Sequence, residues 1–212
     1  RLQDDNAAVR HALSCSMRIT SYILMPALMG LAVVSDKLVI ILYTEKWLPA
    51  VPFMQLVCII YCFSLIGGAN MEVITAMGRS DVVMKWELIK RPIMLGILAI
   101  TAFISPLAIA IGQTIYAICV CFFNAYPNKK IIGYPIHAQI KDLSTNFLSA
   151  LIMAVVVYLI GRIPMNIYLC LTVQLFAGLS IYYALSLFFK NDSFYFLKNF
   201  VLQRIFHRHE EL

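Results

Sequence analysis

The sequence predicts an all-α membrane protein built as a bundle of six transmembrane helices. Hydrophobic residues make up 61% of the 212 residues and charged residues only 13%, which lies outside the usual range of soluble globular proteins. The mean hydropathy is +0.82. In addition, apolar runs close to the length of about 20 residues that crosses a bilayer core recur along the chain.

Six apolar runs define the predicted elements in order. The spans are residues 13–34, 50–77, 88–104, 107–126, 147–160 and 167–189. The polar residues 35–37 are expected to end the first span. Residues 38–47 are too few to cross, so we expect them at the membrane interface, anchored by Tyr43 and Trp47. Short connections between the other spans favour antiparallel neighbours.

The distribution of Lys and Arg predicts the topology. Most of the 17 cations fall before the first span, after the last, or in alternate connections between them. Cationic loops stay in the cytoplasm, so both ends of this segment are expected there. The net charge of +6 is then explained by topology and anionic lipid headgroups rather than by nucleic acid.

The chain divides into a six-helix membrane lobe, residues 1–189, and a tail, residues 190–212. In the tail, apolar residues recur at helical spacing between cations. We expect a cytoplasmic amphipathic helix on the membrane surface. A soluble helix that docks on another protein is the alternative.

Motifs for catalysis or cofactor binding are missing from the sequence. It has no Gly-rich phosphate loop, nucleophile elbow, zinc-protease signature or pair of acids within a span. The six cysteines lie in or beside apolar runs and are interpreted as packing residues. We therefore expect no catalytic residues, no metal site, no cofactor and no enzymatic activity.

Polar residues inside apolar spans are the candidates for a substrate pathway. Such residues are costly in lipid and usually face the bundle interior or a wet cavity. The candidates are Arg18, Gln55, Asn70, Glu72, Gln113 and Asn124. Hydrogen bonding between helices is the alternative role for the amides. For Arg18 the alternatives are a cytoplasmic anchor and a contact with an anionic headgroup.

Glu72 is the acid within the second span. Helical spacing places it on one face with Gly68, Thr75, Ala76 and Arg79. We expect this small, polar stripe to face a neighbouring helix or water rather than lipid. Two roles for Glu72 stay open: a structural carboxylate that reaches the interface or pairs with a cation, and a pathway residue that binds a cation or a polar substrate group.

Residues 25–91 carry a resemblance to a known family. Pro26 with Gly30, "EKWLPAVP" at 45–52 and "AMGRSD" at 76–81 are its most specific pieces. This region resembles the C-terminal half of bacterial polysaccharide exporters, the lipopolysaccharide and O-antigen flippases of the multidrug, oligosaccharidyl-lipid and polysaccharide exporter superfamily.

The resemblance implies one lobe of a two-lobe transporter in the bacterial inner membrane. Such proteins move an undecaprenyl-diphosphate-linked oligosaccharide to the periplasmic leaflet by alternating access. The chain would be the second lobe, because it starts at Arg1 without an initiator Met and opens on what resembles a cytoplasmic lead-in. Its expected partners are this lipid-linked substrate, membrane lipids and the missing N-terminal lobe.

Three other functions stay open. One is a cation-coupled multidrug antiporter of the same superfamily, which an ion site of acids in the other lobe would favour. Another is a membrane enzyme of polysaccharide assembly, which a long periplasmic loop with clustered Arg, His or acids would favour. The last is a membrane scaffold without transport, which the polar residues inside the spans do not support.

Overall fold

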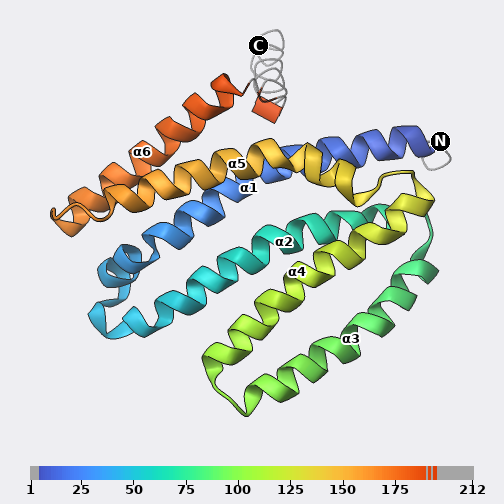
Figure 1. The fold of residues 1–212 in the computed structure, drawn as a ribbon, viewed down its shortest axis with the longest axis horizontal. Coiled ribbons are helices and arrows are strands. Elements are labelled where there is room, and N and C mark those ends of the chain that lie inside the picture. The colour runs from blue at the N-terminus through green and yellow to red at the C-terminus, as the bar shows by residue number, and fades with distance from the viewer. Residues whose placement is uncertain (1–4, 190, 192, 195–212) are drawn as a thin grey trace, which may run out of the picture.

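A computed structural model describes residues 5–189, 191, 193 and 194, and this part of the chain is helical throughout (Figure 1). Its elements are α1 (Asn6–Tyr43), η1 (Glu45–Ala50), α2 (Val51–Ala76), α3 (Ser80–Ala102), α4 (Pro106–Ile131), α5 (Ile136–Ile160) and α6 (Ile167–Phe188). The all-α fold class is confirmed. The predicted amphipathic tail, 190–212, lies almost entirely outside the described residues.

Five stretches of the described residues are long and apolar enough to cross a membrane. They are α1, Glu45–Ala76, α4, α5 and α6. α3 is not among them, because charged residues lie along its first half, from Asp81 to Arg91. Six spans therefore remain a prediction, in which α3 is the uncertain member.

The expected end of the first span at residues 35–37 is wrong. α1 begins at Asn6 and continues for 38 residues to Tyr43; it is capped by Asp5, whose carboxylate accepts hydrogen bonds from the backbone N–H groups of Ala7 and Ala8. Ser35 causes no break, since its hydroxyl donates to the carbonyl of Ala32 inside the helix. The segment expected at the interface is thus the last part of α1 followed by η1.

α5 begins at Ile136, well before the predicted start at residue 147. The first half of α5 has low hydropathy because it contains Gln139, Asp142 and Asn146, and the predicted span therefore began only at residue 147. Each of these side chains forms a hydrogen bond within the bundle, so the polar residues are accommodated by neighbouring helices.

The helices follow one another across the bundle in the order α6, α5, α1, α2, α4, α3, although α5 and α4 also touch (Figure 1). The most extensive contacts are those of α2 with α4 and of α1 with α2 and α5. One apolar cluster joins α1, α5 and α6 around Met25, Met153 and Tyr182. A second joins the start of α1 to the start of α5 around Leu13 and Leu143.

α2 and α4 approach closely at Gly67. A methyl group there would lie 3.3 Å from the Cα of Cys121 and from the amide nitrogen of Asn124. Such contacts are tighter than usual for a side chain, so Gly67 favours this close approach, which brings the polar groups of the two helices within hydrogen-bonding distance.

Candidate functional site

One face of the bundle has exposed polar residues and lies opposite α5. α1 meets α5 through Arg18, whose guanidinium lies 2.5 Å from Asp142, and α2 meets it through Asn70, which donates to Gln139. Side chains two residues apart on a helix, such as Ser16 and Arg18 or Glu72 and Asn70, point in directions about 200° apart. Ser16 and Glu72 therefore lie on the sides of α1 and α2 that point away from α5.

We call this surface the open face. Its residues are Ser16 and Thr20 of α1, and Tyr61, Ser64, Gly68, Glu72 and Thr75 of α2. Thr20 and Gly68 are half-buried and the others are exposed. Hydroxyl groups and one carboxylate thus lie together on one side of these two helices, a composition suited to hydrogen bonding with a polar solute rather than to contact with lipid.

The polar stripe of α2 shares Gly68, Glu72 and Thr75 with the open face. It was expected to face a neighbouring helix or water, and the described helices do not cover it: Glu72, Thr75, Ala76 and Arg79 are all exposed. Within the described chain, no hydrogen bond or ion pair engages the carboxylate of Glu72. The ion pair expected for a structural role is therefore not seen among these residues.

Asn70 lies on the opposite side of α2 and belongs to a buried amide network. Its side chain donates to Gln139 at 2.9 Å and accepts from Asn128 at 2.6 Å, while Gln139 donates to the carbonyl of Tyr134 at 3.2 Å. All three amides are at most 2% exposed. The network ties α2, α4 and α5 together, so Asn70 acts here as a link between helices.

Asn124 links three helices next to this network. Its amide donates to the carbonyl of Gly67 on α2 at 3.1 Å and accepts from the ammonium group of Lys90 on α3 at 2.9 Å. Lys90 is only 5% exposed and pairs with Glu87 at 2.5 Å. Lys90 was counted with the cations of a cytoplasmic connection, whereas it is a buried residue of α3.

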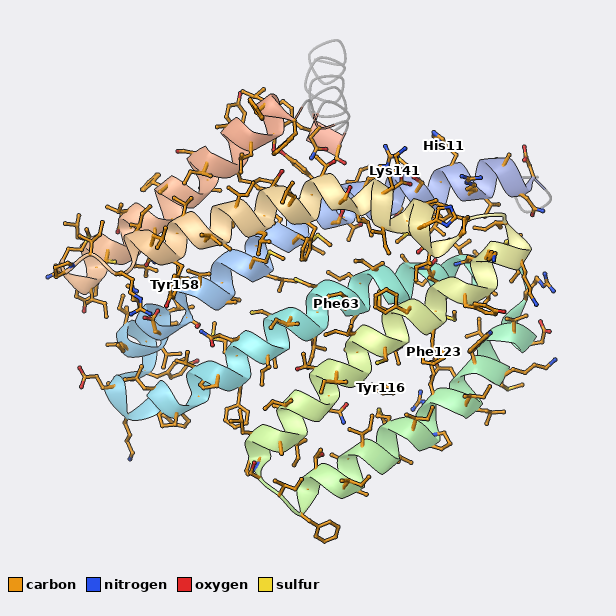
Figure 2. The ribbon with its side chains drawn as sticks, viewed as in Figure 1. His11, Phe63, Tyr116, Phe123, Lys141 and Tyr158 are labelled. Carbon is orange, nitrogen blue, oxygen red and sulfur yellow. The ribbon has the colours of Figure 1, made fainter. Side chains whose placement is uncertain are left out.

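Gln55 and Gln113 lie in other places. Gln55 donates to the carbonyl of Ala32 and to the hydroxyl of Ser35 on α1, beside a charged pocket of about 520 Å³. Tyr158, labelled in Figure 2, also lines that pocket. Gln113 is half-buried on α4 and has no hydrogen bond with the described residues.

Arg18 lies between α1 and α5, with 35% of its side chain exposed. Its ion pair with Asp142 fixes it on the side of α1 away from Ser16. The six candidates therefore do not form one site: Glu72 lies on the open face, Asn70 and Asn124 lie in the interior, and Gln55 and Arg18 line separate pockets at different positions along α1.

Several partners in these networks were not predicted from the sequence, namely Lys90, Asn128, Gln139, Asp142 and Asn146. One signal was available: Asn124 and Asn128 lie four residues apart and share one face of a helix. Within the described residues, no group of three His, Cys, Asp or Glu side chains is arranged to hold a metal ion. The six cysteines are free thiols, four of them buried.

Comparisons with known proteins agree with the resemblance seen in the sequence. Residues 1–52 match a family described as "Polysaccharide biosynthesis protein". The lipopolysaccharide biosynthesis protein WzxC of Escherichia coli is 27% identical over 166 residues, which are 76% of this chain. These matches support membership of the polysaccharide biosynthesis exporter family.

Two further proteins match shorter regions of the chain. The teichuronic acid biosynthesis protein TuaB of Bacillus subtilis is 29% identical over 39% of this chain. A membrane protein in the cps region of Klebsiella pneumoniae is 28% identical over 46%. The matched regions cover 33%, 17% and 20% of WzxC, TuaB and the cps-region protein, so the chain spans about a third of these relatives or less. No solved structure matches the chain.

Proposed function

We propose that this chain is one lobe of a flippase that exports a lipid-linked oligosaccharide in cell-surface polysaccharide biosynthesis. The observation that carries the proposal is the open face, a polar surface along α1 and α2 that no described helix covers. The matches to proteins named for lipopolysaccharide and teichuronic acid biosynthesis support the same class of cargo.

In this proposal the open face lines the substrate pathway. An oligosaccharide diphosphate cannot cross hydrocarbon unaided, so it needs a hydrated, hydrogen-bonding route while its polyprenyl tail stays in lipid. Hydroxyl groups such as those of Ser64 and Thr75 suit sugar hydroxyls. The open face has no cation along most of its length, so the cations for the diphosphate are assigned to a second lobe opposite α1 and α2.

The remaining features of the proposal follow from the family. The substrate is an undecaprenyl-diphosphate-linked oligosaccharide, and the two lobes move it by alternating access. The protein lies in the bacterial inner membrane, with both ends of this segment in the cytoplasm. No chemical step is required of the protein, so we propose a transporter rather than an enzyme.

Complementation tests the transport function. The full-length protein that contains this lobe is expected to restore surface polysaccharide in a strain that lacks its own flippase. Absence of polysaccharide, despite normal insertion into the membrane, would sink the flippase proposal.

Export by variants of Glu72 in the same strain tests whether this residue lines the substrate pathway. Glu72→Leu removes a hydrogen-bonding group worth about 1 kcal/mol, so export is expected to fall several-fold. Glu72→Gln keeps hydrogen bonding and is expected to retain most export. Asp81→Leu, an exposed acid at the start of α3, is the matched control and should leave export unchanged. Full export with both Glu72 variants would show that the carboxylate has no pathway role.

A cation-coupled multidrug antiporter is the second candidate, and the exposed carboxylate of Glu72 favours it. A carboxylate that no described residue neutralises is a suitable cation site on a transport surface. Drug resistance conferred by the wild-type protein and lost with Glu72→Gln, together with failed complementation, would favour the antiporter.

A further inference from the structure

A second polar feature lies on the α5 side of the bundle. It is a pocket of about 840 Å³ between the beginnings of α1 and α5, where Figure 2 shows His11 and Lys141. Its charged and titratable lining residues are Arg10, His11, Arg18, Tyr134, His137, Lys141 and Asp142. We call it the basic pocket. It is separate from the open face, because α1 presents Arg18 to one and Ser16 to the other.

The acid that lines the basic pocket is fully engaged. One oxygen of Asp142 accepts from the guanidinium of Arg18, and the other accepts from the hydroxyls of Ser14 and Tyr134, each at 2.5 Å. Tyr134 is buried, and burial followed by its hydrogen bond to Asp142 raises the pKa of Tyr134, so the phenol stays a donor. Asp142 is therefore a structural anchor for this wall.

The remaining cations of the basic pocket are left without a carboxylate. Within the described chain, neither Arg10 nor Lys141 forms an ion pair, and both are exposed. The Arg10 guanidinium lies 5.5 Å from the ring centre of Tyr134, which holds it at the pocket wall. α5 begins next to Tyr134, at Ile136, and its N-cap residue Pro135 offers no side-chain cap, so the first N–H groups and the positive dipole end of α5 add to the positive field.

An apolar groove lies one turn farther along α5 than the basic pocket, since Lys141 lines the pocket and Ser144 lines the groove. It has a volume of about 510 Å³ and is lined mainly by α2, α4 and α5, including Phe63, Ile140 and Leu148. Along α5, the exposed residues His137, Lys141, Ser144 and Leu148 form one stripe that passes from charged to apolar. Phe63, labelled on α2 in Figure 2, lines the groove, and Lys141, labelled beside α5, lines the basic pocket.

We propose that the basic pocket and the apolar groove together bind an anionic glycerophospholipid of the surrounding bilayer. Arg10 and Lys141 hold its phosphate, with His11 and His137 at the rim, and an acyl chain lies in the groove. Cations and a helix start favour a phosphate, and the adjoining groove favours an amphiphile over a free anion. The site requires only a membrane protein and does not depend on the flippase proposal.

Native mass spectrometry of the full-length protein in detergent tests the lipid site. Phosphatidylglycerol and phosphatidylcholine with the same acyl chains are titrated separately, and bound lipids are counted. One phosphatidylglycerol is expected to bind more tightly than phosphatidylcholine. The double variant Arg10→Gln with Lys141→Gln is expected to weaken that binding about thirtyfold, since it removes two headgroup cations.

The matched control is Lys85→Gln with Lys129→Gln, which removes the same charge from exposed positions on α3 and α4. It should bind phosphatidylglycerol as the wild type does. Leu148→Trp fills the groove without touching the cations and is expected to weaken binding as well, while thermal unfolding checks that each variant is folded.

Four outcomes would overturn the proposal. They are equal binding of the two lipids, an equal loss in the control pair, full displacement by millimolar inorganic phosphate, and tighter binding of undecaprenyl diphosphate than of phosphatidylglycerol at this pocket. The third would indicate a free-anion site, and the fourth a substrate site.

Discussion

Lys90 is a buried cation in a bundle whose other interior polar groups are neutral amides and hydroxyls. Its ammonium group contacts Glu87 at 2.5 Å and Asn124 at 2.9 Å, and its side chain is 6% exposed. Glu87 is 39% exposed and also contacts Arg91 at 3.3 Å. The buried ammonium group of Lys90 therefore relies on Glu87 to compensate its charge, whereas the exposed carboxylate of Glu87 also has Arg91 and the surroundings.

This asymmetry makes a prediction for stability. Glu87→Gln leaves a buried ammonium with only a neutral partner, so we expect the free energy of unfolding to fall by about 2 kcal/mol. Lys90→Met removes the buried charge and leaves Glu87 beside Arg91, so we expect a loss of about 1 kcal/mol or less. Unfolding in sodium dodecyl sulfate titrations measures both.

Arg91→Met is the control for the ion pair, because this side chain is 72% exposed and its contact with Glu87 is screened by solvent or headgroups. It should change stability by less than about 0.5 kcal/mol. A larger loss for Lys90→Met than for Glu87→Gln would contradict the assignment of Lys90 as the dependent partner.

Single residues also show which features of the site can be predicted from the sequence and which cannot. Helical spacing grouped Glu72, Thr75 and Ala76 on one face of α2, because periodicity depends only on the chain itself, and all three are exposed in the structure. The partners of Asn70 and Arg18 were not predictable, since Gln139 and Asp142 lie far along the chain and only the packing of α5 brings them close. The roles of the six pathway candidates stay predictions.

At the scale of helices, hydropathy located the apolar centres of the elements but not their ends. The predicted fourth span ended at residue 126, because Asn128 and two lysines follow, although α4 continues to Ile131. Asn128 is completely buried, and its side-chain amide donates to the backbone carbonyl and the side-chain oxygen of Asn70, so its polarity does not end the helix. A hydropathy window treats such a residue as exposed to lipid, whereas the bundle supplies its partner.

The closest approach of α2 and α4 gives a prediction at this scale. Gly67→Leu places a side chain against the backbone of Cys121, so we expect it to push the helices apart and lower the free energy of unfolding by about 1–3 kcal/mol. Gly68→Leu is the matched control, since no atom lies within 4 Å of a methyl group there. Equal losses in the two variants, measured by the same titration, would mean that the approach of α2 to α4 is not tight.

At the scale of the whole molecule, the two sides of the bundle differ in chemistry. The α5 side carries the basic pocket beside an apolar groove, and the other side carries the open face. The fold class followed from composition alone, but this division required the packing order of the helices. Whether α3 completes six spans depends on its charged first half, which hydropathy does not resolve.

The central claim is that the open face lines a water-filled pathway while the exposed surface of α5 meets lipid. Substituted-cysteine labelling tests it in a background that lacks the six native cysteines. Ser64→Cys and Leu151→Cys are matched, because both residues are exposed and lie near the middle of their helices. A small, charged maleimide added to membranes should label Ser64→Cys and spare Leu151→Cys. Labelling of neither position, or of both equally, would contradict the account.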